Sequence, residues 1–217
     1  RVTNQYFHTE EELLYFSILP TATMYARNAM FSGLMPSEIE KLYPDMWDDD
    51  DNEGNKNQYE WQLLQKLMQR MGRKEKLFFD KVSNLKSAKK LAEILQGIKD
   101  NELSVLIFNF VDMISHARTE MDMIRELASD EKAYRSLTLS WFNHSSLLDL
   151  LKALSLLDFR IVVTTDHGTI RVNNPVKVIG DRETNTNLRY KLGRNLNYKA
   201  KQVFEVTNPR QAFLPSR

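Results

Sequence analysis

Two short apolar runs, far apart in the chain, constrain the fold more than any other feature. Residues 104–111 (SVLIFNFV) and 159–165 (FRIVVTT) are almost continuously apolar and rich in β-branched and aromatic side chains. Runs of this kind are typical of central strands that are buried on both faces. Because helical patterns separate them, we expect an α/β fold with a largely parallel central sheet flanked by helices.

The helical patterns occupy much of the remaining sequence. The spacing of apolar residues predicts helices over residues 23–34, 60–71, 84–100 and within 119–157, with a polar turn (MGRKEK) between the second and the third. The tail alternates short β-like runs, such as 176–180 and 202–207, with polar turns. We expect one domain over residues 1–217, with 58–100 as a helical cap or insertion.

Composition narrows the cellular setting and the ligand chemistry. No apolar run approaches the length of a membrane span, and the N-terminal residues lack the pattern of a signal peptide. The chain has no cysteine, which excludes disulfides and thiolate metal sites and fits a reducing cytoplasm. We therefore expect a cytoplasmic protein in which any metal has oxygen and imidazole ligands.

Charge is unevenly spread although the net charge is only +1. Residues 171–217 contain 10 Lys and Arg against 3 Asp and Glu, whereas residues 45–53 (DMWDDDDNE) are almost purely acidic. A basic tail would raise the local concentration of phosphate-bearing ligands. The alternative is that these charged side chains only form a solvated face of the protein.

The first candidate site follows the run at 104–111, where the sequence reads Asp112-Met-Ile-Ser-His116. If the chain turns helical there, residues four apart share one face, so the carboxylate and the imidazole could hold one metal ion. The alternative is a hydrogen-bonded polar pair at the end of a strand.

The second candidate site follows the run at 159–165, where Asp166 and His167 precede Gly168. In a tight turn both side chains could converge on one ion, and the glycine permits an unusual backbone. The alternative is a turn with a capping aspartate. Taken together, the two Asp/His clusters at the end of two strands of one sheet would suit a two-metal centre. His8 and His144 have no such setting.

The third candidate site is the helix predicted over residues 23–34, which is mostly apolar but carries Arg27 and Asn28. A buried guanidinium needs a partner, which could be a protein carboxylate or a phosphate. Thr23 lies at the helix N-terminus, where backbone N–H groups favour anions. The alternative for Thr21 and Thr23 is simple N-capping.

Four segments in order resemble a known family. LPTATMYARNAMFSGLMPSEI, NFVDMISHAR, VVTTDHG and NLRYKLGRNLNY are similar to the PglZ domain of the alkaline phosphatase superfamily, over nearly the whole chain. The resemblance is closest to the version in PorX-type response regulators, which are associated with type IX secretion. It implies an alkaline phosphatase-like fold and a two-zinc phosphodiesterase that is the effector domain of a response regulator.

The resemblance also implies roles for single residues. Thr23 matches the nucleophile and a contact of one metal, and Asp166 and His167 match ligands of that metal. The pair Asp112 and His116 matches ligands of the other metal. Asn57 matches a phosphate-contacting asparagine. The resulting hypothesis is phosphoryl transfer through a phosphothreonine, with two zinc ions and Arg27 or Asn57 stabilising the transferring oxygens.

Two elements of the family pattern have no counterpart in this sequence. These are an aspartate after a first strand ahead of Thr23 and a histidine in a Gly-rich motif after the tail, so we expect a fragment of a longer protein. The expected partners are a phosphodiester or nucleotide-type small substrate, signalling proteins and a second copy in a homodimer. The alternatives are a regulatory interaction module with a vestigial site and a nucleotide sensor that binds without turnover.

Overall fold

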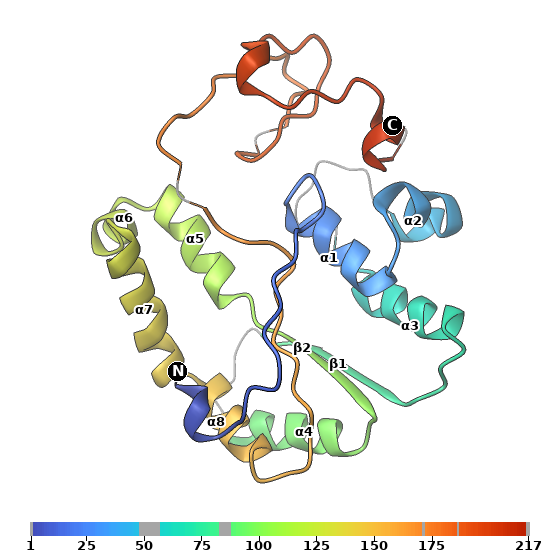
Figure 1. Cartoon of the computed structure of the whole chain (residues 1–217), viewed down its shortest axis with the longest axis vertical. Coiled ribbons are helices and arrows are strands. Elements are labelled where there is room, and N and C mark those ends of the chain that lie inside the picture. Colours follow the sequence, from blue (N-terminus) through green and yellow to red (C-terminus); the bar gives the residue numbers. More distant parts are fainter. Residues whose placement is uncertain (1, 48–56, 83–87, 171, 186, 216–217) are drawn as a thin grey trace. The chain divides into compact units, whose positions relative to one another are not determined.

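The computed structural model describes residues 2–47, 57–82, 88–170, 172–185 and 187–215 (Figure 1). Its helices and strands, in chain order, are α1 (Thr23–Ser32), α2 (Pro36–Leu42), α3 (Glu60–Arg70), β1 (Leu77–Lys81), α4 (Ala88–Lys99), β2 (Leu103–Ile107), α5 (Phe110–Glu120), α6 (Asp122–Leu127), α7 (Glu131–Asn143) and α8 (Ser146–Leu154). The chain forms two compact units, which we call unit 1 (Arg1–Leu13 and Glu75–Val163) and unit 2 (Leu14–Lys74 and Thr164–Arg217).

Unit 1 contains a parallel pair of strands joined by a helix. β1 and β2 lie side by side in Figure 1, with Leu77 opposite Leu103 at one end and Lys81 opposite Ile107 at the other. Parallel strands need a crossover connection, and α4 supplies it. The mixed α/β class is therefore confirmed, although the sheet has two strands within the described residues.

The core of unit 1 lies between the sheet and two amphipathic helices. Ile94 and Ile98 on α4 pack with Leu150 and Leu154 on α8, and Val82 completes this buried cluster. Ser145 caps α8 by accepting a hydrogen bond from the backbone N–H of Leu148 at 3.4 Å. Successive residues of α4 and α8 that are three or four positions apart thus bury one face of each helix.

The prediction of a strand over residues 159–165 is wrong. Within the described residues this run is paired with no strand, and Val162 and Val163 are 80% and 86% exposed. Residues 164–166, which include the end of this run and belong to unit 2, are joined to residues 15–17 by side-chain hydrogen bonds and not by a backbone ladder. An apolar run becomes a strand only where a partner strand satisfies its backbone groups.

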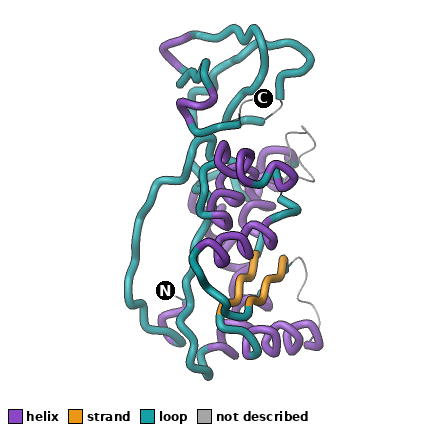
Figure 2. Tube along the Cα trace, turned by 90° about the vertical axis from the view of Figure 1, so that its right-hand side faces the viewer, coloured by secondary structure: helices purple, strands orange, loops and turns teal. Residues whose placement is uncertain are grey.

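Three further expectations differ from the structure. The first run ends as a strand at Ile107, because the chain already turns into α5 at Phe110. β1 lies between the polar turn and the helix predicted over 84–100, in residues for which no strand is predicted. The tail runs 176–180 and 202–207 are not strands, and Figure 2 shows the described tail as mainly loop, with one isolated bridge between Ile179 and Asn197.

Unit 2 is built on the packing of α1 against α3. The predicted helix over residues 23–34 is confirmed as α1, which ends at Gly33 in the left-handed conformation with φ 62°. The backbone N–H of Gly33 donates to the carbonyl of Ala29 at 2.8 Å. A methyl group on Gly33 would come within 2.9 Å of Leu67 Cδ1 on α3, so this glycine allows both the turn and the close approach.

Gly33→Ala should therefore destabilise the protein more than Gly72→Ala does. Gly72 also has a positive φ, of 69°, but nothing lies within 4 Å of the added methyl group. We expect Gly72→Ala to lower the free energy of unfolding by about 1–2 kcal/mol through backbone strain alone. Gly33→Ala should cost about 1 kcal/mol more, because Leu67 must also move. Urea unfolding of both variants measures the difference, and equal losses would contradict the proposed α1–α3 contact.

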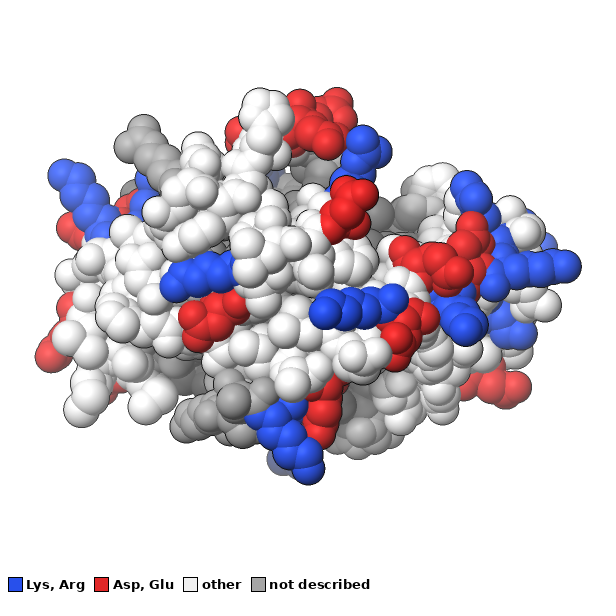
Figure 3. All heavy atoms as spheres, turned by 90° about the horizontal axis from the view of Figure 1, so that it is seen from below, with Lys and Arg blue, Asp and Glu red and all other residues white. Residues whose placement is uncertain are grey.

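Charged side chains of both signs are interspersed on the face drawn in Figure 3. Several form pairs on unit 1, such as Lys152 with Asp149 at 3.7 Å and Lys90 with Asp80 at 3.0 Å. The Asp80 carboxylate accepts a hydrogen bond from Lys90 and thereby raises the pKa of Lys90. Most of the acidic run at 45–53 lies outside the described residues. Among the described helices, none has the length and apolar character needed to cross a membrane.

The segment predicted as a cap or insertion, residues 58–100, is divided between the units. α3 belongs to unit 2, whereas β1 and α4 belong to unit 1. A role as a cap therefore stays a prediction, as does the organisation of residues 1–217 as one domain.

Candidate functional site

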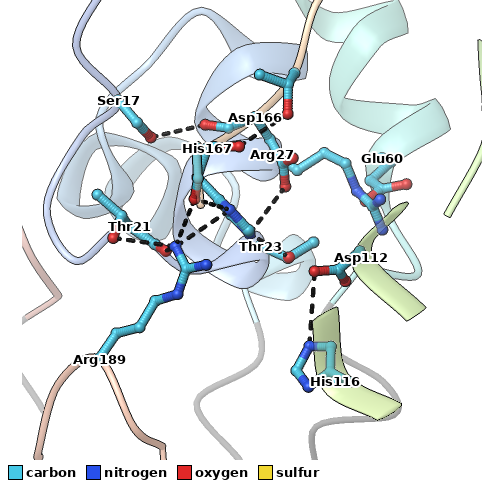
Figure 4. Close-up of polar contacts among 12 residues, drawn as sticks. Ser17, Thr21, Thr23, Arg27, Glu60, Asp112, His116, Asp166, His167 and Arg189 are labelled. Atoms are coloured by element: carbon cyan, nitrogen blue, oxygen red, sulfur yellow. Dashed lines mark hydrogen bonds and ion pairs between the residues drawn. The ribbon is translucent and has the colours of Figure 1, made fainter. Parts of the chain in front are cut away.

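Thr23 is the first residue of α1, and its hydroxyl faces an imidazole. Its Oγ1 lies 3.0 Å from Nε2 of His167 (Figure 4). The N-cap residue of α1 is Ala22, and the cap has no side-chain hydrogen bond. The alternative role of Thr21 or Thr23 as an N-cap is therefore not found. The Thr23 oxygen is instead held beside His167, a residue 144 positions further along the chain.

The segment that carries Asp166 and His167 is fixed by residues 15–17 of the same unit. The Tyr15 hydroxyl lies 3.0 Å from Thr164 Oγ1 and also donates to the carbonyl of Thr165. Ser17 Oγ donates to the carbonyl of Asp166 at 2.7 Å. These bonds hold a loop without a backbone ladder, and they leave the side chains of His167 and Asp166 only 9% and 17% exposed.

One carboxylate oxygen of Asp166 is available to bind a further group. Asp166 Oδ2 is buried and has no hydrogen-bond partner among the described residues, which is unfavourable for a carboxylate. It lies 3.9 Å from His167 Nε2. Two ligands in a tetrahedral zinc site, at bonds of 2.0 Å, are about 3.3 Å apart. The distance of 3.0 Å from Thr23 Oγ1 to His167 Nε2 is close to that value, and the distance of 3.9 Å from Asp166 Oδ2 to His167 Nε2 is longer. The binding of one metal ion by these three groups stays a prediction.

Arg189 lies beside His167 and contacts the backbone on both sides of the site. The Nη1 atom of Arg189 carries two hydrogens, and its two nearest acceptors are the carbonyls of Thr21 at 2.8 Å and Gly168 at 3.1 Å. Arg189 Nη1 is also 3.2 Å from His167 Nδ1, and this Nδ1 lies 3.2 Å from the carbonyl of Gly168. In the tautomer that has its hydrogen on Nδ1, the lone pair of Nε2 faces Thr23, where it can accept the hydroxyl proton or bind a metal ion.

Arg189 was not among the residues predicted for the site. It lies in the segment NLRYKLGRNLNY, which contributed only to the family resemblance. Its contact with Thr21 spans 168 positions of the chain. No local spacing connects the two residues, so periodicity could not have identified it.

Asp112 and His116 form a pair on α5 in unit 1, drawn in Figure 4. Asp112 Oδ1 lies 3.7 Å from His116 Nε2, as expected of residues four apart on one helix face. Both are accessible, with His116 68% and Asp112 43% exposed. Within the described ranges no three His, Asp or Glu side chains gather as a metal site. The union of this pair with Asp166 and His167 in one centre stays a prediction.

Arg27 has the carboxylate partner that was one of its two alternatives. Its Nε donates to Oε1 of Glu60, which is the first residue of α3 and is completely buried. The ion pair links α1 to α3 inside unit 2. Asn57 is half-buried in the turn that precedes α3. Contacts of Arg27 and Asn57 with a substrate stay predictions.

Comparison with known protein families adds to this geometry. Residues 2–212 match the family described as the BREX system PglZ alkaline phosphatase-like domain. The chain belongs to the PglZ family. A search of curated proteins found no match. Membership of PglZ in the alkaline phosphatase-like group suggests a phosphoesterase-type hydrolase, and a threonine hydroxyl beside an imidazole and a carboxylate is a suitable site for such chemistry in a PglZ domain.

Proposed function

We propose that this PglZ domain is a zinc-dependent phosphodiesterase with Thr23 as its nucleophile. The observation that carries the proposal is the position of His167 Nε2 between two oxygens. It lies 3.0 Å from Thr23 Oγ1 and 3.9 Å from Asp166 Oδ2, which is buried and has no hydrogen-bond partner among the described residues. Family membership supports phosphoester chemistry independently. A hydroxyl at the end of a helix that it does not cap is available for reaction.

Asp166, His167 and Thr23 would hold one zinc ion, and Asp112 with His116 would provide ligands for a second. Bound zinc would lower the pKa of the Thr23 hydroxyl and offset negative charge on the phosphoryl oxygens. Asp166 and His167 are suited to this role because carboxylate oxygen and imidazole nitrogen are common zinc ligands. In the chain itself, the bonds from Tyr15 and Ser17 hold these two residues opposite Thr23.

The reaction would take place in two steps at Thr23. Its Oγ1 attacks phosphorus, an oxygen–phosphorus bond forms, and the bond to the leaving alcohol breaks, with the alcohol taking up a proton. Water then attacks the phosphothreonine, so the Thr23 oxygen is released and the phosphate monoester leaves. The position of Thr23 at the N-terminus of α1 favours this course, because backbone N–H groups there stabilise a bound phosphate.

The proposed substrate and the proposed cellular role follow from the resemblance of the four segments to the PglZ domain. It favours a phosphodiester, such as a nucleotide derivative, over a monoester. It also favours a role as the effector domain of a response regulator of the PorX type. The positively charged tail, with Arg189 at the site, suits a phosphate-bearing substrate.

Zinc content and turnover measured on one full-length sample test the proposal. The protein as purified should contain zinc and hydrolyse bis(p-nitrophenyl) phosphate. Removal of zinc with a chelator should abolish hydrolysis, and added zinc should restore it. Hydrolysis that is unchanged after zinc removal would contradict the metal assignment. Zinc and nucleotide binding without any turnover would indicate a sensor instead of an enzyme.

A further inference from the structure

Arg189 connects the two loops that carry the proposed nucleophile and the proposed metal ligands. Its Nη1 donates to the carbonyl of Thr21, two residues before Thr23, and to the carbonyl of Gly168, next to His167. Figure 4 shows the guanidinium between Thr21 and His167. Because an arginine side chain is always charged, both bonds are charge-assisted and stronger than bonds between neutral groups.

The residue after Arg189 anchors the same segment by a different kind of contact. The ring of Tyr190 packs edge-on against Tyr25 of α1, with ring centroids 5.7 Å apart and an interplanar angle of 84°. Tyr25 is buried and also contacts Trp47, with centroids 5.8 Å apart. Tyr190 thus attaches the tail to α1 through an aromatic contact, and Arg189 attaches it through a polar contact to Thr21, just before α1.

We propose that Arg189 is a positioning residue that fixes Thr23 against His167 by binding the backbones of both loops. The proposal rests on the proposed function of Thr23 and His167, but the clamp itself is a property of the metal-free chain. The loop at 164–168 has no backbone ladder, so side-chain bonds such as those from Arg189 set its position. A loss of this clamp should loosen both loops and misplace the nucleophile, since small displacements of reacting groups are costly.

The primary test is hydrogen exchange on the metal-free, full-length protein. Arg189→Ala should speed exchange of the Ala22 amide, which donates to the carbonyl of Pro20 at 2.8 Å beside the bond from Arg189, by about tenfold or more, as expected for the loss of hydrogen bonds to a charged group. Arg194→Ala is the matched control, because Arg194 is an exposed arginine of the same tail with no contact to either loop among the described residues. Its exchange should equal that of the wild type.

A conservative variant tests the clamp if the alanine variant is poorly folded, and two further measurements use Arg189→Ala itself. Arg189→Lys, which retains a charge but not the planar fork, should show intermediate exchange. Added guanidinium ion should slow exchange in Arg189→Ala and recover part of its activity. Activity of Arg189→Ala should fall through kcat, with KM for the diester little changed.

The outcomes separate this inference from the proposed function. Exchange that stays unchanged at the Ala22 amide would overturn the clamp, and a rise in KM without faster exchange would show that Arg189 contacts the substrate phosphate instead. Faster exchange in a protein whose wild type hydrolyses no phosphodiester would support the clamp and refute the proposed function.

Discussion

Replacing Thr23 by alanine is expected to abolish phosphodiester hydrolysis while leaving the fold intact. Loss of a nucleophile in enzymes of known mechanism lowers kcat by roughly 10⁴-fold or more, and a similar loss is expected here. The Thr23 side chain caps no helix, and among the described residues its hydroxyl has one hydrogen-bond contact, with His167 Nε2. Truncation should therefore affect chemistry far more than stability. Initial rates with bis(p-nitrophenyl) phosphate, together with thermal unfolding, measure both effects.

Thr23→Ser serves as the matched control for this prediction. Serine retains the oxygen at the same position, so it should retain measurable turnover and form the corresponding serine ester of p-nitrophenyl phosphate. If Thr23→Ala hydrolyses the diester as fast as Thr23→Ser does, the hydroxyl is not the nucleophile. Mass spectrometry of rapidly quenched reactions would detect a p-nitrophenyl phosphoryl group on the wild-type peptide that contains residue 23 and on no peptide of the alanine variant.

His167→Ala is expected to have the second largest effect, by weakening zinc binding. The side chain is 9% exposed, and its Nε2 lies between Thr23 Oγ1 and Asp166 Oδ2. Its removal would therefore delete the central one of the three proposed zinc ligands. The loss of zinc affinity should exceed the roughly 10- to 100-fold typical of removing a residue that only orients a ligand. Turnover at limiting zinc should fall with it.

His144→Ala is the control for the histidine prediction. His144 is exposed at the end of α7, and its Nδ1 contacts the carbonyl of Ser140 at 2.8 Å. It should bind zinc as the wild type does. Isothermal titration calorimetry of the two metal-free variants with zinc compares their zinc affinities. Equal zinc affinities would remove His167 from the ligand set.

The parts of the fold that sequence predicts well are those decided locally. α1 was predicted because its apolar spacing and its terminal Gly33 lie within a dozen residues, and the approach of Asp112 to His116 follows from helical geometry alone. The sequence does not predict β1, because five residues after a polar turn are too few to show a clear hydrophobic period. Its strand conformation depends on pairing with β2. Residues 159–165 have the composition of a strand but no paired neighbour in the described chain.

The candidate site also contains both residues that the sequence predicts and residues that it does not. The roles of Thr23, Asp166 and His167 came from resemblance, and the structure brings the first and the last within 3.0 Å. Glu60, the partner of Arg27, and Arg189, the clamp, were not predicted. Their partners are 33 and 168 positions away, and such contacts depend on tertiary packing that no local periodicity encodes.

Zinc-edge anomalous diffraction from crystals of the zinc-loaded, full-length protein tests the central claim most directly. The account predicts one anomalous peak bonded to Thr23 Oγ1, Asp166 and His167, and a second bonded to Asp112 and His116. Anomalous density that appears only elsewhere, with the Thr23 hydroxyl bonded to no metal ion, would contradict it.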